Sequence, residues 1–471
     1  MFKLVKNELY KLFHKKSTII TLFILMMFVV LTNLFYKNMD MSFSVYYADM
    51  EYINNLKKEI NSFDLINGNM SEYASLHASL ADQEYVNGKQ NDWQVSKYYS
   101  IVSSKVSDYY YNLYVYNDKE AADKLQQEIN DLKSRLDNND WEYFVNLDIE
   151  SLEYNISMAE GNSNMIGSIE LEAMKYQKYL LDYRLKNKVS YDNSYLNTAL
   201  NNLESDITGK INYERAQTDK IRENYKEAYA SFYENEYIIN NKVDTKNVQS
   251  LREIIISFFS EYVFLILIFI IMIAGSIVSD EFNKGTIKLL LTLPYRRSQI
   301  LMAKLLTILL MIPFVTIFIL FIEILIGGII LGFDSLSIPV VAYNFKINAI
   351  ETMSVWKYFC LNFAGILPML FLLATLAFAL STLICSNAFA ITITFCGYIG
   401  SGIINNFVLY YNVEFLKYFV TPNWDLRSFI FGGVSEYSIP MAQSIVTCAI
   451  YFLIMVVVAF VVFKKKNIKN I

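Results

Sequence analysis

Long runs without charged residues constrain the fold of this chain more than any other feature of its sequence. Asp, Glu, Lys and Arg are absent from residues 17–36, 262–279, 305–322, 358–413 and 437–463. A helix needs about 20 apolar residues to cross the hydrocarbon core of a bilayer. The fourth run is long enough for two such helices with a turn near Cys385, so the sequence predicts an all-α membrane protein with six transmembrane helices.

These runs and the stretches between them predict the order of segments along the chain. The transmembrane helices are expected over residues 17–36, 251–279, 300–333, 357–385, 387–410 and 441–463. Between and around them we expect a cytoplasmic amphipathic interfacial helix (1–16), an extracytoplasmic helical domain (37–250), a cytoplasmic elbow (280–299), an outer loop (334–356), an outer re-entrant or interfacial connection (411–440) and a cytoplasmic tail (464–471). The first run is too long for the core of a signal peptide, and no small-x-small cleavage site follows it, so we expect an uncleaved span.

Lysine and arginine are concentrated in three places that indicate the orientation of the chain. The 16 residues before the first run hold five lysines, residues 280–304 hold five basic residues, and the tail after Phe463 holds four. Basic segments beside transmembrane helices stay in the cytoplasm. We therefore expect a multi-pass protein of the cell membrane with both termini and the elbow in the cytoplasm, which agrees with an even number of spans.

Residues 37–250 differ sharply in composition from the rest of the chain. They hold 22 Lys and Arg against 35 Asp and Glu, whereas the remainder holds 19 against 11. The segment has no proline, and apolar residues recur at heptad-like spacing from Leu125 to Leu136 and from Leu196 to Ile207. This pattern predicts long helices packed as an antiparallel bundle or a coiled-coil-like stalk. Its acidic, Tyr-rich surface could bind cationic peptides, or it could be an ordinary solvated surface.

The elbow is both basic and amphipathic. Residues 280–304 read DEFNKGTIKLLLTLPYRRSQILMAK, and a helix over 281–293 would place Lys284 and Lys288 together at i, i+4. Pro294 ends that helix, because proline lacks an N–H and clashes with the preceding turn. Such a segment indicates a cytoplasmic docking surface, although any cytoplasmic loop can be basic and amphipathic.

The elbow resembles the corresponding segment of ABC-2 type transporter permeases. The shared pattern of acid, Gly-Thr, Leu-Leu, Pro, Arg, Leu and Lys is matched by Glu281, Gly285-Thr286, Leu289-Leu290, Pro294, Arg297, Leu301 and Lys304. In that family the elbow carries the coupling helix that docks on a separate ATPase subunit. The resemblance covers roughly residues 1–36 and 251–471, because a minimal ABC-2 permease has only a short loop between its first two spans.

The resemblance implies functional residues and partners. It places ATPase coupling at Glu281, Gly285, Thr286, Leu290, Pro294, Arg296, Arg297 and Glu8. The implied partners are an ABC ATPase subunit, a second identical or related permease, membrane lipid, and a hydrophobic or amphipathic substrate such as a peptide antibiotic, a lipid or a drug. The chain itself is expected to bind no cofactor, because ATP and Mg²⁺ belong to the ATPase, and no nucleic acid.

Residues 1–16 predict a helix that lies in the membrane interface. Its apolar face consists of Phe2, Val5, Leu9, Leu12 and Phe13, and its lysines lie mostly away from that face. It resembles the N-terminal helix of ABC-2 permeases, which packs beside the elbow; a simple positive stop before the first span is the alternative. Glu8 is its only acidic residue, and a salt bridge from Glu8 to the elbow or to the partner is our hypothesis.

Three polar residues in the predicted spans are candidates for a translocation path. Glu323 interrupts the third span and Glu261 lies in the second. An ionisable residue in an apolar run is costly unless it faces a cavity or a partner. Both glutamates could instead lie near the outer interface, toward which each falls in its span. Asn362 in the fourth span is a further candidate, although small polar groups are common in membrane helices.

The sequence offers no catalytic constellation. Its two histidines, His14 and His77, are expected on opposite sides of the membrane, and it contains no GxxxxGK[ST] phosphate loop. All four cysteines fall in the predicted membrane portion, so we expect neither a disulfide framework nor a Cys-based metal site. Together with the resemblance to ABC-2 permeases, this implies a non-enzymatic permease subunit of an ATP-driven exporter. The alternatives are a membrane-anchored receptor or scaffold whose ectodomain binds a partner, and an intramembrane enzyme.

Overall fold

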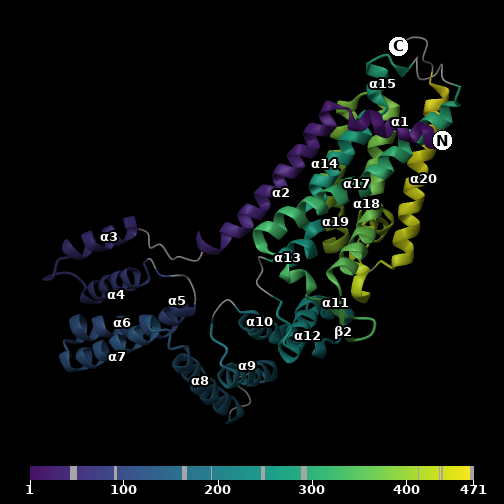
Figure 1. Cartoon of the computed structure of the whole chain (residues 1–471). Helices are drawn as coiled ribbons and strands as arrows, with labels where there is room; N and C mark the ends of the chain where they lie inside the picture. Colours follow the sequence, from purple (N-terminus) through teal and green to yellow (C-terminus); the bar gives the residue numbers. More distant parts are fainter. Residues whose placement is uncertain are drawn as a thin grey trace. The chain divides into compact units, whose positions relative to one another are not determined.

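The computed structural model divides the chain into two compact units. They are Met1–Phe35 with Val248–Ile471, called here the membrane unit, and Tyr36–Asn247, called here the helical domain. The structure describes residues 1–42, 50–87, 89, 93–161, 167–191, 194–245, 250–287, 294–411, 413–433, 435, 437 and 439–466. Figure 1 shows the order of the elements along the chain.

The membrane unit is built from helices long and apolar enough to cross a bilayer. Six helices within the described residues meet this condition: α2 (Lys16–Ser42), α14 (Phe258–Ser276), α17 (Arg297–Leu331), α18 (Val355–Ile384), α19 (Asn387–Tyr411) and α20 (Met441–Lys465). Helices are expected here, because backbone polar groups in a bilayer must be satisfied within the chain. The prediction of an all-α membrane protein with six membrane helices is confirmed.

Helix α18 is the centre of the membrane unit. It packs against α14, α17, α19 and α20, and one of its faces is buried along most of its length. The ring of Phe359 lies 5.2 Å from the rings of both Phe258 and Phe259 on α14. Cys385, in the left-handed conformation, ends α18 just before α19 begins, at the position predicted for this turn.

The N-terminal helix, the start of the elbow and the end of the last span lie at one end of the membrane unit. Figure 1 shows α1 (Phe2–Phe13), α15 (Ser279–Asn283) and the end of α20 together there. Lys466 Nζ, directly after α20, donates to the carbonyl oxygen of Thr382 at 3.1 Å, near the end of α18. An even number of spans places both termini on the same side of the membrane, which agrees with α1 and the end of α20 lying at one end of the unit.

The second span departs from the continuous helix expected over residues 251–279. It consists of α13 (Leu251–Ile256) and α14, separated at Ser257. The Ser257 hydroxyl donates to the carbonyl oxygen of Glu253 at 2.9 Å. A serine bonded back to the preceding turn competes with the helix backbone and bends it, which accounts for the interruption.

The connections after the third and fifth spans are more ordered than the sequence indicates. The segment expected as an outer loop contains an antiparallel hairpin of β1 (Val340–Asn344) and β2 (Ala349–Met353), with Val340 opposite Met353. The described part of 411–440 contains the 3₁₀ segments η4 (Glu414–Tyr418), η5 (Thr421–Asn423) and η6 (Arg427–Gly432). The Leu426 N–H donates to the Gly365 carbonyl oxygen at 2.9 Å, so this connection contacts α18 well inside that helix.

The described residues of the helical domain form two hydrophobic cores. Its main helices are α3 (Met50–Asn61), α4 (Met70–Val86), α6 (Ser103–Tyr111), α7 (Lys119–Asp137), α8 (Trp141–Gly161), α9 (Ser168–Asn187), α10 (Tyr195–Arg215) and α12 (Lys226–Asn241), with shorter α5 (Trp93–Lys97) and α11 (Asp219–Glu223) and π-helical η1 (Tyr98–Val102) and η2 (Asn112–Tyr116). The heptad residues Ile129, Leu132 and Leu136 lie in the first core. Leu200, Leu203 and Ile207 lie in the second. Both heptad patterns therefore identify buried helix faces correctly.

Candidate functional site

The elbow begins as a short helix and then turns sharply. Helix α15 ends at Asn283, and Gly285 has a φ of +69°. The continuous helix expected from residue 281 to 293 is therefore wrong at its start, because a positive φ is incompatible with a continuing right-handed helix and is readily adopted by glycine. Leu290 lies outside the described residues, which resume at Pro294.

The third span begins with a backbone cap at Arg296. The Arg296 N–H donates to the Gln299 side chain at 3.0 Å, which closes the first turn of α17. Arg297 Nη1 donates to the carbonyl oxygen of Lys466 at 3.1 Å, so this predicted coupling residue contacts the tail of its own chain. Arg296 is exposed, as are Pro294, Lys284 and Thr286. The elbow thus presents a cationic surface outside the packed bundle.

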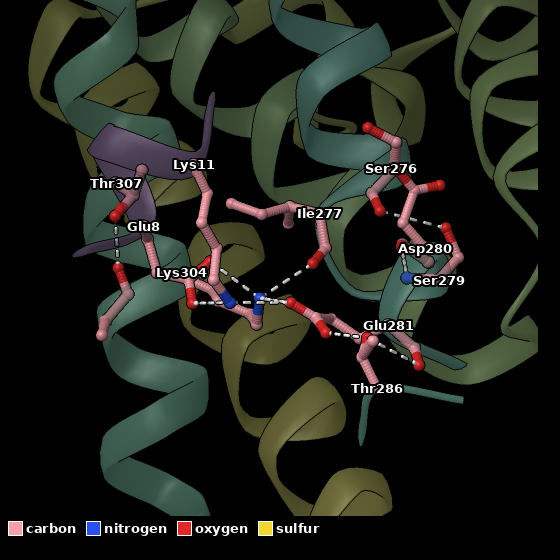
Figure 2. A network of polar contacts seen from close by, with 12 residues as sticks. Glu8, Lys11, Ser276, Ile277, Ser279, Asp280, Glu281, Thr286, Lys304 and Thr307 are labelled. Carbon is pink, nitrogen blue, oxygen red and sulfur yellow. Dashed lines mark hydrogen bonds and ion pairs between the residues drawn. The ribbon is translucent and has the colours of Figure 1, made fainter. Parts of the chain in front are cut away.

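Buried charges join the N-terminal helix to the elbow and to the third span. Lys304 on α17 is 2% exposed, and its Nζ lies 2.8 Å from Glu8 Oε2 and 3.4 Å from Glu281 Oε1. It also donates to the Ile277 carbonyl oxygen at 3.1 Å (Figure 2). Lys11 on α1 lies 3.2 Å from Glu281 and 3.5 Å from Glu8. We call Glu8, Lys11, Glu281 and Lys304 the inner ion-pair network.

A second ion pair lies beside this network. Lys15 Nζ, between α1 and α2, contacts Asp280 Oδ2 at 2.7 Å and donates to the Ser276 hydroxyl at 3.2 Å. Asn387, at the start of α19, donates to the other Asp280 oxygen at 2.9 Å. Asp280 therefore ties the end of the second span to the N-terminal segment and to the fifth span.

The charges of the inner ion-pair network stabilise one another. Burial alone would raise the pKa of Glu281, but Lys304, the Thr286 hydroxyl and Lys11 hold that pKa below its ordinary value. Burial alone would lower the pKa of Lys11, but Glu8 and Glu281 raise that pKa above its ordinary value. Both groups are therefore charged near neutral pH, because each is paired with groups of opposite charge.

A cavity of 570 Å³ opens beside these ion pairs. It is lined by α1, by the end of α14, by α15 and by the start of α17, and its lining includes Glu8, Lys11, Lys15, Asp280, Glu281 and Lys304. The cavity holds both signs of charge together with apolar groups such as Leu4 and Ile300. A surface of this kind can receive a side chain or a loop from a partner, and the ion pairs hold its walls in place.

The structure brings together part of the predicted coupling set. Glu8, Glu281 and Thr286 meet in one cluster, in which the Thr286 hydroxyl donates to Glu281. Glu8 forms its salt bridge with Lys304 on α17, just after the elbow, and Lys304 in turn pairs with Glu281 of the elbow. Sequence reasoning did not assign Lys11, Lys15, Asp280 and Lys304 to this site. The signal for Lys304 was its place at the edge of an apolar run, where an unpaired charge is costly.

The three translocation candidates occupy different environments. Glu323 is fully buried and receives a hydrogen bond of 2.6 Å from the Tyr262 hydroxyl. Glu261 is exposed on α14. Asn362 is buried, and its amide donates to the Tyr358 carbonyl oxygen of its own helix at 3.0 Å. Sequence reasoning did not identify Tyr262 or Asn33, which contacts Glu323 from α2.

These features define a multi-pass membrane protein with a helical domain inserted after its first span. A family model described as "Protein of unknown function (DUF2705)" matches residues 223–469, which is more than half of the chain, and the chain belongs to that family. It is similar to the uncharacterized protein YhcI of Bacillus subtilis (strain 168), with 30% identity over 204 residues. The match covers 43% of this chain and 64% of that relative, and no solved structure matches the chain.

Proposed function

We propose that this chain is the permease subunit of an ATP-driven exporter of the ABC-2 type. The observation that supports the proposal best is the inner ion-pair network, which fastens α1, the elbow and the start of α17 to one another. A force applied to the elbow would move these three elements as one body. In this proposal the termini and the elbow are cytoplasmic, and the helical domain is extracytoplasmic.

The coupling surface of the proposed permease is the exposed part of the elbow. Four exposed residues of the elbow lie outside the inner ion-pair network: Lys284, Gly285, Pro294 and Arg296. The positive charge of Lys284 and Arg296 suits an acidic face on an ABC ATPase subunit, which would bind ATP and Mg²⁺. Closure of the ATPase pair would push the elbow, and the network would pass that movement to α14 and α17.

The transported substrate in this proposal is hydrophobic or amphipathic, because such a molecule can enter a permease from the bilayer. A second permease chain, identical or related, completes the exporter. These parts of the proposal follow from the resemblance of the elbow to ABC-2 permeases, and residues of this chain carry no direct signature of the substrate.

Copurification with a candidate ABC ATPase subunit from the same genome tests the proposal. The two proteins are coexpressed, and the ATPase recovered with solubilised wild type is compared with that recovered with Lys284→Glu and Gly285→Trp. Both changes lie at exposed elbow positions, and the space around Gly285 is open. Tryptophan at position 285 must take a φ of +69°, which costs about 1 kcal/mol, so the thermal stability of each variant is measured beside its ATPase recovery. Lys346→Glu, an exposed change in the hairpin turn, is the matched control.

We expect the wild type and Lys346→Glu to retain the ATPase and the two elbow variants to lose it. Equal recovery with all variants would show that the elbow is not the docking surface. Absence of the ATPase from every preparation would contradict the exporter proposal and would favour a membrane-anchored receptor whose helical domain binds a partner.

A further inference from the structure

A carboxyl group is enclosed between three helices far from the inner ion-pair network. Glu323 on α17 is 0% exposed. It accepts a hydrogen bond of 2.6 Å from the Tyr262 hydroxyl on α14, and Asn33 Nδ2 on α2 lies 3.0 and 3.1 Å from its two oxygens. The Thr32 hydroxyl lies 3.0 Å from that of Tyr262. We call Thr32, Asn33, Tyr262 and Glu323 the outer polar cluster.

No cation compensates this carboxyl group among the described residues. On α13, Arg252 pairs with Glu253 and donates to the carbonyl oxygens of Ile338 and Pro339, and no salt bridge joins it to Glu323. The charged residue of α14 nearest in sequence to Tyr262 is the exposed acid Glu261. The basic residues of α2 are Lys16, at its other end, and the exposed Lys37, one turn beyond Asn33. The basic residues of α17 itself are Arg297 and Lys304, which lie at its other end. A buried carboxylate without a cation is costly, whereas the neutral acid is not.

The cluster also holds more acceptors than donors. Asn33 is 0% exposed, and its Oδ1 has no hydrogen-bond partner among the described residues. The Asn33 amide donates one hydrogen bond to the Val29 carbonyl oxygen, and the Thr32 hydroxyl donates to the same oxygen. One more hydrogen on an oxygen of the cluster would reduce this shortage. Because N–H and O–H groups already face the carboxyl, a proton fits the site better than a metal ion, which would need oxygen ligands there.

Gly327 makes this close arrangement possible. A Cβ at position 327 would lie 2.7 Å from Glu323 Oε1 and 2.8 Å from Asn33 Oδ1. The glycine therefore leaves the space in which the carboxyl and the amide approach each other. Any larger residue would push α2 and α17 apart at this level.

The cluster lies at the opposite side of the hydrocarbon core from the inner ion-pair network. Glu323 follows Lys304 by 19 positions on α17, which corresponds to about 28 Å at 1.5 Å per residue. The hydrocarbon core of a bilayer is about 30 Å thick. Water and protons can therefore reach Glu323 from the outer boundary of the membrane once the helices around it separate.

The outer polar cluster also marks the end of the buried face of the first span. Among the described side chains of α2 the buried ones are Thr18, Leu25, Val29 and Asn33, which share one face, and the first segment of the membrane unit ends two residues after Asn33, at Phe35. The geometry points to Glu323 as a proton-binding site that locks the outer end of α2 against α14 and α17. The proton comes from the outer solvent and forms an O–H bond on Glu323; its loss leaves a carboxylate that requires water and releases α2.

Infrared spectroscopy of the full-length protein in lipid nanodiscs tests whether Glu323 holds a proton. The C=O stretch of a protonated carboxylic acid is followed from low to high pH. We expect such a band at neutral pH in the wild type and in Glu261→Gln, and its loss in Glu323→Gln. Equal bands in Glu323→Gln and wild type would overturn the assignment. If Glu323→Gln does not fold, Tyr262→Phe must shift the band, because that change removes a hydrogen bond to the acid; an unshifted band would equally overturn it.

A spin label at the end of the first span tests the lock. The label is placed by Leu34→Cys, an exposed position, in a chain whose four cysteines are replaced by serine. We expect the label to become more mobile as the pH rises through the loss of the infrared band, and to stay immobile in Glu323→Gln. A pH-dependent mobility that persists in Glu323→Gln, or a mobility independent of pH in both chains, would show that Glu323 does not control α2.

Discussion

Replacement of Lys304 by Met is the most direct test of the inner ion-pair network. The change keeps much of the length and volume of the side chain and removes its charge. The 2% exposed ammonium lies 2.8 Å from Glu8 and 3.4 Å from Glu281, so two acidic groups lose their common partner. The Ile277 carbonyl oxygen, 3.1 Å from Lys304 Nζ, also loses its donor.

The expected loss follows from what remains around the two acids. Removing one member of a buried ion pair costs about 3–5 kcal/mol, because the other charge is left uncompensated. Lys11 stays 3.2 Å from Glu281 and 3.5 Å from Glu8, and it is partly exposed, so it supplies some of the missing charge. We therefore expect a loss near the lower limit, about 3 kcal/mol, in the free energy of unfolding of the membrane unit.

Unfolding of the solubilised full-length protein measures this loss, with Lys284→Met as the control. Lys284 is exposed on the same elbow, and its replacement should change stability by less than about 0.5 kcal/mol. A double-mutant cycle with Glu8→Gln should give a coupling energy above about 1 kcal/mol, since these two groups touch. A Lys304→Met protein as stable as Lys284→Met would refute the reasoning that these buried charges hold α1 to the elbow.

Three further changes test other parts of the structure. The pKa of Glu281 lies below its ordinary value of 4.5, so the charge of Glu281 stabilises the fold above pH 4.5. Lowering the pH below 4.5 should therefore destabilise the membrane unit. Glu281→Gln should weaken this pH dependence in unfolding curves. Gly285→Ala should lower the free energy of unfolding by about 1 kcal/mol, because alanine at position 285 must keep a φ of +69°. Thermal unfolding measures this loss, and an unchanged stability would show that the turn relaxes freely. Gly209→Ala should destabilise the helical domain by about 1–2 kcal/mol, since the new Cβ would lie 2.4 Å from the Cβ of Ala228. Gly161→Ala is the control: its Cβ has open space, and its stability should be within about 0.5 kcal/mol of wild type in the same assay.

The membrane helices and the heptad faces could be predicted because their signals are local. An uncharged run of about 20 residues has one stable conformation in a bilayer, whatever its neighbours are. The buried positions Ile129, Leu132 and Leu136 follow from the period of a single helix. Neither prediction needs to know which segments meet in space.

The structures of the elbow and of the connections after the third and fifth spans could not be predicted from local patterns. The amphipathic pattern after residue 280 predicts a helix, but Gly285 takes a left-handed conformation and ends α15. The hairpin of residues 340–353 was missed, because strand pairing depends on a partner segment more than on local preference.

The sequence by itself determined that the chain crosses the membrane in helices, that an acidic helical domain follows the first span, that Glu323 is a costly charge in an apolar run, and that Glu8 is the only acid of residues 1–16. Only the tertiary structure decided what the partners of these two acids are. Glu8 meets Lys304 across 296 positions, and Asn33 meets Glu323 across 290. Contacts between such distant positions leave no periodic pattern in the sequence, because they depend on how whole helices pack against one another.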